Sequence, residues 1–235
     1  MFSRILPPDP FMDIAGFTVQ VKTNARARRV TLRYDSKKEH FVVTAPKRTS
    51  KKFITEFLTT HQDWMARQQS VAPQKIHPLT DGHITIQGIT RRIEHSEGTG
   101  VTVTLHPDKL HIQCRDARLP RALQRFIRQH AEQIITPLCH DKAAIIDKKI
   151  TTINFRDTTS RWGSCAHDGT LSFSWRLVMA PQEVIDYVVA HEIAHLQHFD
   201  HSPAFWALCR KLSTHYTQGK HWLQLNGQSL QQVEL

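Results

Sequence analysis

The segment that ends at His201 constrains this 235-residue chain most, because it places metal-binding side chains at helical spacing. It contains the pattern His-Glu-x-x-His, from His191 to His195. Residues four apart on a helix share one face and lie about 6 Å apart along the axis, so two imidazoles can reach one metal ion. Glu192 projects into a neighbouring sector, where it can hold a water molecule rather than the ion. The motif therefore predicts a helix that carries a hydrolytic metal site.

A third ligand is needed, because catalytic zinc takes three protein ligands and keeps one position for water. His201 lies beyond the expected end of the helix, where the chain can turn back toward the metal. His198 is on the same helix and would crowd the open position, so we favour His201. A carboxylate from the following helix is the other alternative, and Asp200 is expected to cap or orient rather than to ligate. The expected cofactor is about one Zn²⁺ per chain on His191, His195 and His201, although Mn²⁺, Co²⁺ and Ni²⁺ also suit histidine sites.

The periodicity of apolar residues predicts both strands and helices, and hence an α+β fold. Alternation predicts strands over residues 17–21, 30–34, 41–45, 84–86, 101–105, 110–112, 152–155 and 170–175. Helical spacing predicts helices over residues 50–69, 119–148, 181–198 and 202–212. Ser50 and Ser202 are the expected N-caps of two of these helices. Pro137 is expected to kink or interrupt the long helix, because proline lacks an N–H group.

The change from short strands to a long helical segment sets the expected domain boundary. Residues 1–116 are expected to form an N-terminal antiparallel β-rich region with a helix. Residues 117–235 are expected to form a mainly helical metallohydrolase domain with a small sheet. The sequence does not fix whether the two parts fold separately.

The chain is strongly basic, with 31 Lys and Arg against 21 Asp and Glu, a net charge of +10. Such a charge favours anionic partners, among them nucleic acids and nucleotides. The N-terminal part contains a basic cluster made of Arg26, Arg28, Arg29, Arg33, Lys47, Arg48, Lys51 and Lys52. This cluster is consistent with a weak nucleic-acid contact, and equally with a solvated edge that discourages strand pairing, which is the simpler interpretation.

The spacing of the cysteines and the hydropathy of the chain indicate the cellular compartment of the protein. The cysteines Cys114, Cys139, Cys165 and Cys209 are scattered and form no Cys-x-x-Cys pair, which favours a reducing environment. The N-terminus has no apolar stretch of the signal-peptide kind, and no segment approaches the length that spans a bilayer. We therefore expect a cytoplasmic protein with no membrane contact.

Three stretches together resemble a known family, the YgjP-like zinc metallopeptidases, which are related to the WLM and SprT-type proteases. The stretches are Ser-Arg-Trp-Gly-Ser-Cys at residues 160–165, Tyr-Val-Val-Ala-His-Glu-Ile-Ala-His-Leu at 187–196, and His-Ser-Pro-Ala-Phe-Trp at 201–206. The resemblance covers most of residues 17–225 in the same order and spacing. It implies a compact zinc-dependent hydrolase domain with ligands His191, His195 and His201 and with Glu192 as general base.

The expected function is therefore a zinc-dependent hydrolase, and the resemblance makes it a metallopeptidase acting on a peptide substrate. Water activated by zinc on three histidines would attack the substrate, with Glu192 accepting the proton. One alternative keeps the site but changes the substrate to a nucleotide phosphoanhydride, as the positive charge suggests. A second alternative is a basic nucleic-acid-binding protein with a structural zinc, whose fourth position would be closed by His198 or Cys165.

A hydrolase also needs a group that stabilises the negative charge of the transition state. Arg161, His198 and Tyr216 are the main candidates, and His167 and His215 are further ones. The sequence does not choose among them. Phe205 and Trp206, by contrast, continue an apolar helical face and are expected to pack against the metal-binding helix.

Overall fold

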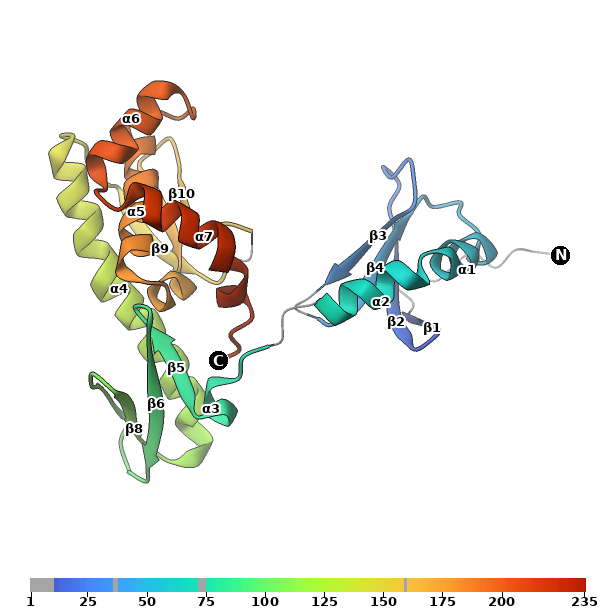
Figure 1. The fold of residues 1–235 in the computed structure, drawn as a ribbon, viewed down its shortest axis with the longest axis horizontal. Coiled ribbons are helices and arrows are strands. Elements are labelled where there is room, and N and C mark those ends of the chain that lie inside the picture. Colours follow the sequence, from blue (N-terminus) through green and yellow to red (C-terminus); the bar gives the residue numbers. More distant parts are fainter. Residues whose placement is uncertain (1–10, 36–37, 72–74, 159) are drawn as a thin grey trace. The chain divides into compact units, whose positions relative to one another are not determined.

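The computed structural model describes residues 11–35, 38–71, 75–158 and 160–235. Contacts divide the chain into two compact units, Met1–Gln74 and Lys75–Leu235 (Figure 1). Both units combine helices with strands, which confirms the α+β class. Among the described residues, no helix combines the length and the apolar character needed to cross a membrane.

The first unit is a four-stranded sheet with two helices. Its strands lie in the order β1 (Phe11–Ile14), β2 (Phe17–Thr23), β4 (His40–Ala45) and β3 (Thr31–Asp35). Its helices are α1 (Lys51–Thr60) and α2 (Gln62–Val71). Alternate residues of β2, such as Val19 and Val21, are buried against the apolar side of the helices, including Ile54 and Leu58.

Two expectations for this unit need correction. Strands β2 and β4 pair in parallel, so the sheet is mixed rather than purely antiparallel. The helix expected over residues 50–69 is two helices, because α1 ends at its C-cap His61 before α2 starts. Ser50 is the N-cap of α1 as expected, and its hydroxyl accepts a hydrogen bond from the Phe53 N–H.

The second unit contains two sheets. The four-stranded sheet has the order β5 (His83–Ile86), β6 (Ile89–Ser96), β8 (Lys109–Gln113) and β7 (Thr102–Leu105), and α3 (Pro78–Asp81) precedes it. The three-stranded sheet has the order β10 (Gly163–Cys165), β11 (Thr170–Ser174) and β9 (Thr152–Arg156). Strand β10 is thus at an edge and pairs with β11 alone among the described strands.

Helices link the two sheets into one core. They are α4 (Leu119–Ile145), α5 (Gln182–His195), α6 (Pro203–Leu212) and α7 (Tyr216–Gln231), with the short η1 (Asp116–Arg118) and η2 (Trp175–Met179). Helix α4 continues through Pro137 without interruption and buries a stripe that includes Ile127 and Ile135. The buried core joins these residues to Ile112 of β8 and Val189 of α5.

This shared core explains why the observed division falls at residue 74 and not at the expected boundary near 117. Strands β7 and β8 contact α4, and β5 and β8 contribute buried residues to the same core as α4. A boundary falls where few contacts cross, and many apolar contacts cross residue 117. The strands after residue 75 therefore belong with the helices that follow them.

A buried ion pair fixes the turn between α6 and α7. The ammonium group of Lys142, on α4, pairs with Asp186 of α5 and donates a hydrogen bond to the Leu212 carbonyl. The Ser213 hydroxyl donates to the other oxygen of Asp186. Because a buried charge is costly without partners, this network ties the end of α6 to both α4 and α5.

Helix α7, which the sequence analysis did not predict, approaches α5 closely at a glycine. A Cβ atom at Gly219 would lie 2.5 Å from the Cβ of Tyr187 and 2.6 Å from the carbonyl oxygen of Glu183. At Gly227, in the same helix, the nearest atoms to a Cβ would be 3.4 Å away. Close packing therefore requires glycine at position 219 but not at position 227.

We predict that alanine is destabilising at only one of these two glycines. Gly219→Ala should lower the free energy of unfolding by about 1–3 kcal/mol, because α7 must move away from the α5 backbone. Gly227→Ala, its matched control, should leave stability unchanged or raise it by up to about 1 kcal/mol through better helix propensity. Denaturant unfolding of both variants measures this, and equal stability of the two would contradict the close approach.

Candidate metal centre

Three histidines come together at the end of α5. His191 and His195 lie one turn apart on the helix, and His201 lies in the segment that leads to α6. One ring nitrogen of each lies within 4.8 Å of the others. The Nε2 atoms of His191 and His201 are 3.3 Å apart. Two Zn–N bonds of 2.0–2.1 Å at a tetrahedral angle place their nitrogens about 3.3–3.4 Å apart, so the spacing fits a zinc ion.

The hydrogen bonding and burial of these imidazoles suit metal binding. The Nδ1 atom of His195 lies 2.9 Å from the His198 carbonyl oxygen, so Nδ1–H donates and Nε2 keeps its lone pair. Burial, with the charges of His195 and His201, lowers the pKa of His191 to about 4. Burial also lowers the pKa of His195. The rings of His191 and His195 are therefore neutral near pH 7, which is the form that binds a metal.

Aromatic side chains from α6 hold the rings in place. The Phe205 ring is buried, with its centroid 4.9, 4.5 and 4.8 Å from those of His191, His195 and His201. Trp206 covers His191 and His201 at 5.7 and 5.3 Å. These contacts orient His191, whose buried Nδ1 has no hydrogen-bond partner among the described residues. As expected, Phe205 and Trp206 pack against the metal-binding helix.

The local sequence explains why α6 starts where it does. Ser202 is the N-cap, and its hydroxyl accepts a hydrogen bond from the Phe205 N–H at 3.4 Å. Pro203 occupies the first turn, where its missing N–H costs nothing. This helix start, directly after His201, confirms the expected N-cap and turns the chain back toward α5.

Glu192 is buried on the side of α5 that faces β10. Its side chain is so close to Gly163 that a Cβ there would lie 2.5 Å from its Cγ and 2.6 Å from its Oε1. Burial raises the pKa of Glu192 to about 8, and the positive charge of Arg161 opposes this rise. A divalent cation on the neighbouring histidines would act like Arg161: it would lower the pKa of Glu192 and favour the carboxylate.

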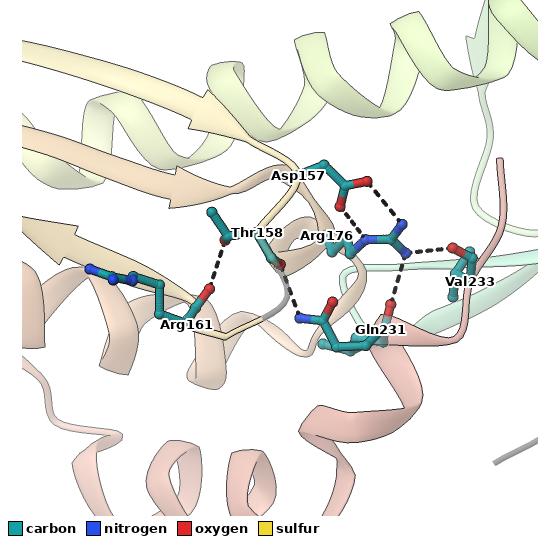
Figure 2. Close-up of polar contacts among 7 residues, drawn as sticks. Asp157, Thr158, Arg161, Arg176, Gln231 and Val233 are labelled. Carbon is teal, nitrogen blue, oxygen red and sulfur yellow. Dashed lines mark hydrogen bonds and ion pairs between the residues drawn. The ribbon is translucent and has the colours of Figure 1, made fainter. Parts of the chain in front are cut away.

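Arg161 is carried on an anchored loop (Figure 2). The Thr158 hydroxyl donates to the Arg161 carbonyl at 2.8 Å, and the Gln231 side chain donates to the Thr158 carbonyl at 3.3 Å. Buried Arg176 pairs with Asp157 at 2.7 Å and donates to main-chain carbonyls at the end of α7. The loop that leads to β10 is thus tied to the C-terminal helix.

The other predicted site residues take different places. His198 contributes its main-chain carbonyl to His195, while its ring lies beside Gln197. Tyr216 packs edge-on against Tyr187 and Trp206, two rings that both contact His191. The remaining candidates lie elsewhere: the His167 ring stacks on Phe199, His215 lies near Asp186, and Cys165 is outside the histidine group.

Lys220 also lies beside these aromatic rings, although no local sequence pattern predicted it. Its ammonium nitrogen lies 4.9 Å from the centroid of Trp206 and 3.4 Å from the Tyr216 hydroxyl. Its charge is one of the causes that lower the pKa of His191. Lys220 follows Tyr216 by one helical turn, so the spacing would have pointed to it had α7 been predicted.

We predict that His201 and not His198 is needed for metal binding. His201→Ala should weaken Zn²⁺ binding by about 10-fold or more, because a nitrogen ligand is lost. His198→Ala is the matched control and should keep the wild-type affinity, because its main-chain carbonyl remains. Competition titration with a chromophoric zinc chelator measures both, and the reverse order of affinities would exclude this ligand set.

One of the comparisons with known proteins found a match, at the level of the family. A family model described as "YgjP-like, metallopeptidase domain" matches residues 28–226. The match spans both compact units and includes every residue of the histidine group. No curated protein and no solved structure gave a match.

Proposed function

Because the chain belongs to the YgjP-like metallopeptidase family, we propose that this metal-dependent peptidase uses zinc held by His191, His195 and His201. The observation that carries the proposal is the convergence of three imidazole nitrogens within 4.8 Å beside a buried glutamate. The described part of the chain adds no further His, Cys, Asp or Glu to this group. Three ligands leave room for water, which supports a catalytic rather than a structural zinc.

Glu192 is the proposed general base. Zinc, when bound, would polarise the scissile carbonyl and make water acidic enough to ionise near neutral pH. The carboxylate of Glu192 would accept the proton of the attacking water and pass it to the leaving amine. Gly163 supports this role, because only a residue without a side chain lets β10 lie directly over the carboxylate.

Strand β10 favours a peptide over a nucleotide as the substrate. It is the edge of its sheet, and its outer backbone groups face no other strand of the described residues. An extended peptide can add to such an edge through main-chain hydrogen bonds. Since Gly163 of β10 contacts Glu192, a peptide bound there would lie beside the catalytic base.

Tyr216 is the proposed donor to the developing oxyanion. Its ring packs against Tyr187, which in turn contacts His191, and the ammonium group of Lys220 donates a hydrogen bond to its hydroxyl. Arg161 is the alternative, because its charge acts on Glu192. His198 is less suited, since its carbonyl rather than its ring faces His195.

The four cysteines support a cytoplasmic location. All are free thiols, and three of them, Cys114, Cys139 and Cys209, are buried in the core. Burial raises the pKa of Cys139 and of Cys209 to about 12, so both thiols stay protonated and unreactive. Such thiols suit a reducing compartment.

Replacing the base should abolish turnover but keep the metal. Glu192→Gln should retain about one zinc per chain and lose roughly 10²–10⁴-fold in kcat, because the amide cannot accept the proton. The control is Glu183→Gln, an exposed position on the same helix, which should keep full activity.

Elemental analysis measures the zinc content of each variant. Mass spectrometry measures cleavage of a mixed peptide library, and nucleoside triphosphates are tested as the second substrate class. Unchanged turnover in zinc-loaded Glu192→Gln would exclude this base, and cleavage of triphosphates alone would exclude the peptidase.

Removing the Tyr216 hydroxyl should affect the chemical step. Tyr216→Phe should lower kcat about 10²-fold with KM nearly unchanged, because the lost donor acts on the transition state. Steady-state kinetics on a cleaved peptide measure this. A normal kcat in Tyr216→Phe together with a low kcat in Arg161→Gln would assign the role to Arg161 instead.

A further inference from the structure

A basic groove lies between the first half of α4 and strand β9. Its volume is about 990 Å³, and no residue of the histidine group lines it. The floor includes the partly buried Ile153 and Phe155. Four arginines line the groove: Arg118, Arg121, Arg125 and Arg128. The groove therefore combines a row of positive charge with an apolar and aromatic surface.

The arginines form a row because of their spacing along the helix. Arg121, Arg125 and Arg128 are separated by four and three residues, which places them on one helical face. Arg118 comes just before the helix, so the row extends over about 15 Å. All four side chains are exposed, and none makes an ion pair or side-chain hydrogen bond within the described part of the chain. Their charges are thus free to bind a ligand.

The chemistry of the row favours phosphate groups. The guanidinium group has a planar set of donors that binds phosphate through two hydrogen bonds, which lysine cannot do. The row starts at the N-terminus of α4, where the helix dipole attracts anions. The first turn of α4 has no acidic residue to neutralise that end. Glu132, one turn beyond Arg128, is the acidic residue in the lining.

The apolar floor points to unpaired bases. Bases of a single strand can stack on an aromatic ring such as Phe155, whereas the bases of a duplex are already stacked on one another. An acidic peptide would satisfy the arginines but has no flat rings for Phe155. We propose that this groove binds single-stranded nucleic acid, with its phosphates on the arginine row and a base against Phe155. This inference is independent of the peptidase site.

The test compares three forms of the full-length protein. The groove variant is Arg121→Gln/Arg125→Gln/Arg128→Gln. The control is Lys38→Gln/Arg67→Gln/Lys211→Gln, which loses the same charge from exposed positions outside both the groove and the N-terminal basic cluster. Binding of a fluorescent 12-nucleotide single strand is measured by anisotropy from about 50 to 200 mM salt. Unchanged circular dichroism and melting temperature establish that the variants are folded.

We expect wild type and control to bind alike and the groove variant to bind at least 10-fold more weakly. The slope of log K against log salt should become shallower by about 2 in the groove variant, since each phosphate contact contributes about 0.7. Phe155→Leu should weaken binding roughly fivefold or more while the salt slope stays the same. Equal losses in the groove variant and the control would overturn the proposal, as would absent wild-type binding. Equal competition by a glutamate peptide or a duplex of matched charge would overturn the assignment to single strands.

Discussion

The contact between Gly163 of β10 and the side chain of Glu192 determines how closely the small sheet can approach α5. A larger residue at position 163 would push either the strand or the carboxylate away. Because the strand stays close, Glu192 is buried next to a sheet edge and one residue from His191. The burial of Glu192 and its position beside a sheet edge both follow from this one approach.

Two buried cations keep the elements around α5 in place. Lys142 joins α4, α5 and the turn between α6 and α7. Arg176 joins the loop after β9 to the end of α7. Lys142 binds one main-chain carbonyl and Arg176 binds two, and each also pairs with a carboxylate, so removing either cation would leave its partners without these bonds. The first of these anchors holds the end of α6, the helix whose Phe205 and Trp206 rings contact the histidines.

Local patterns in the sequence predicted much of the fold and of the candidate site. The spacing of His191 and His195, and the Ser202-Pro203 start of α6, were sufficient to predict that His201 returns to the helix. Helix α7 was missed because Gly219 and Gly227 weaken its apolar pattern, and Lys220 was missed with it. The parallel pairing of β2 with β4 and the division at residue 74 depend on contacts between distant segments, which no local pattern encodes.

All three histidines of the group come from one short stretch, His191–His201, whereas the surroundings of Glu192 do not. A chain that has formed α5 and the turn into α6 already brings the imidazoles together. The carboxylate reaches its pocket only after β10, an earlier segment, has joined the sheet and docked. Contacts between residues near in sequence cost less loop-closure entropy than contacts between distant segments, so the histidine group needs less of the completed fold than the pocket of Glu192 does. The proposed metal ligands thus depend on one short segment of the chain, whereas the proposed base depends on the assembled domain.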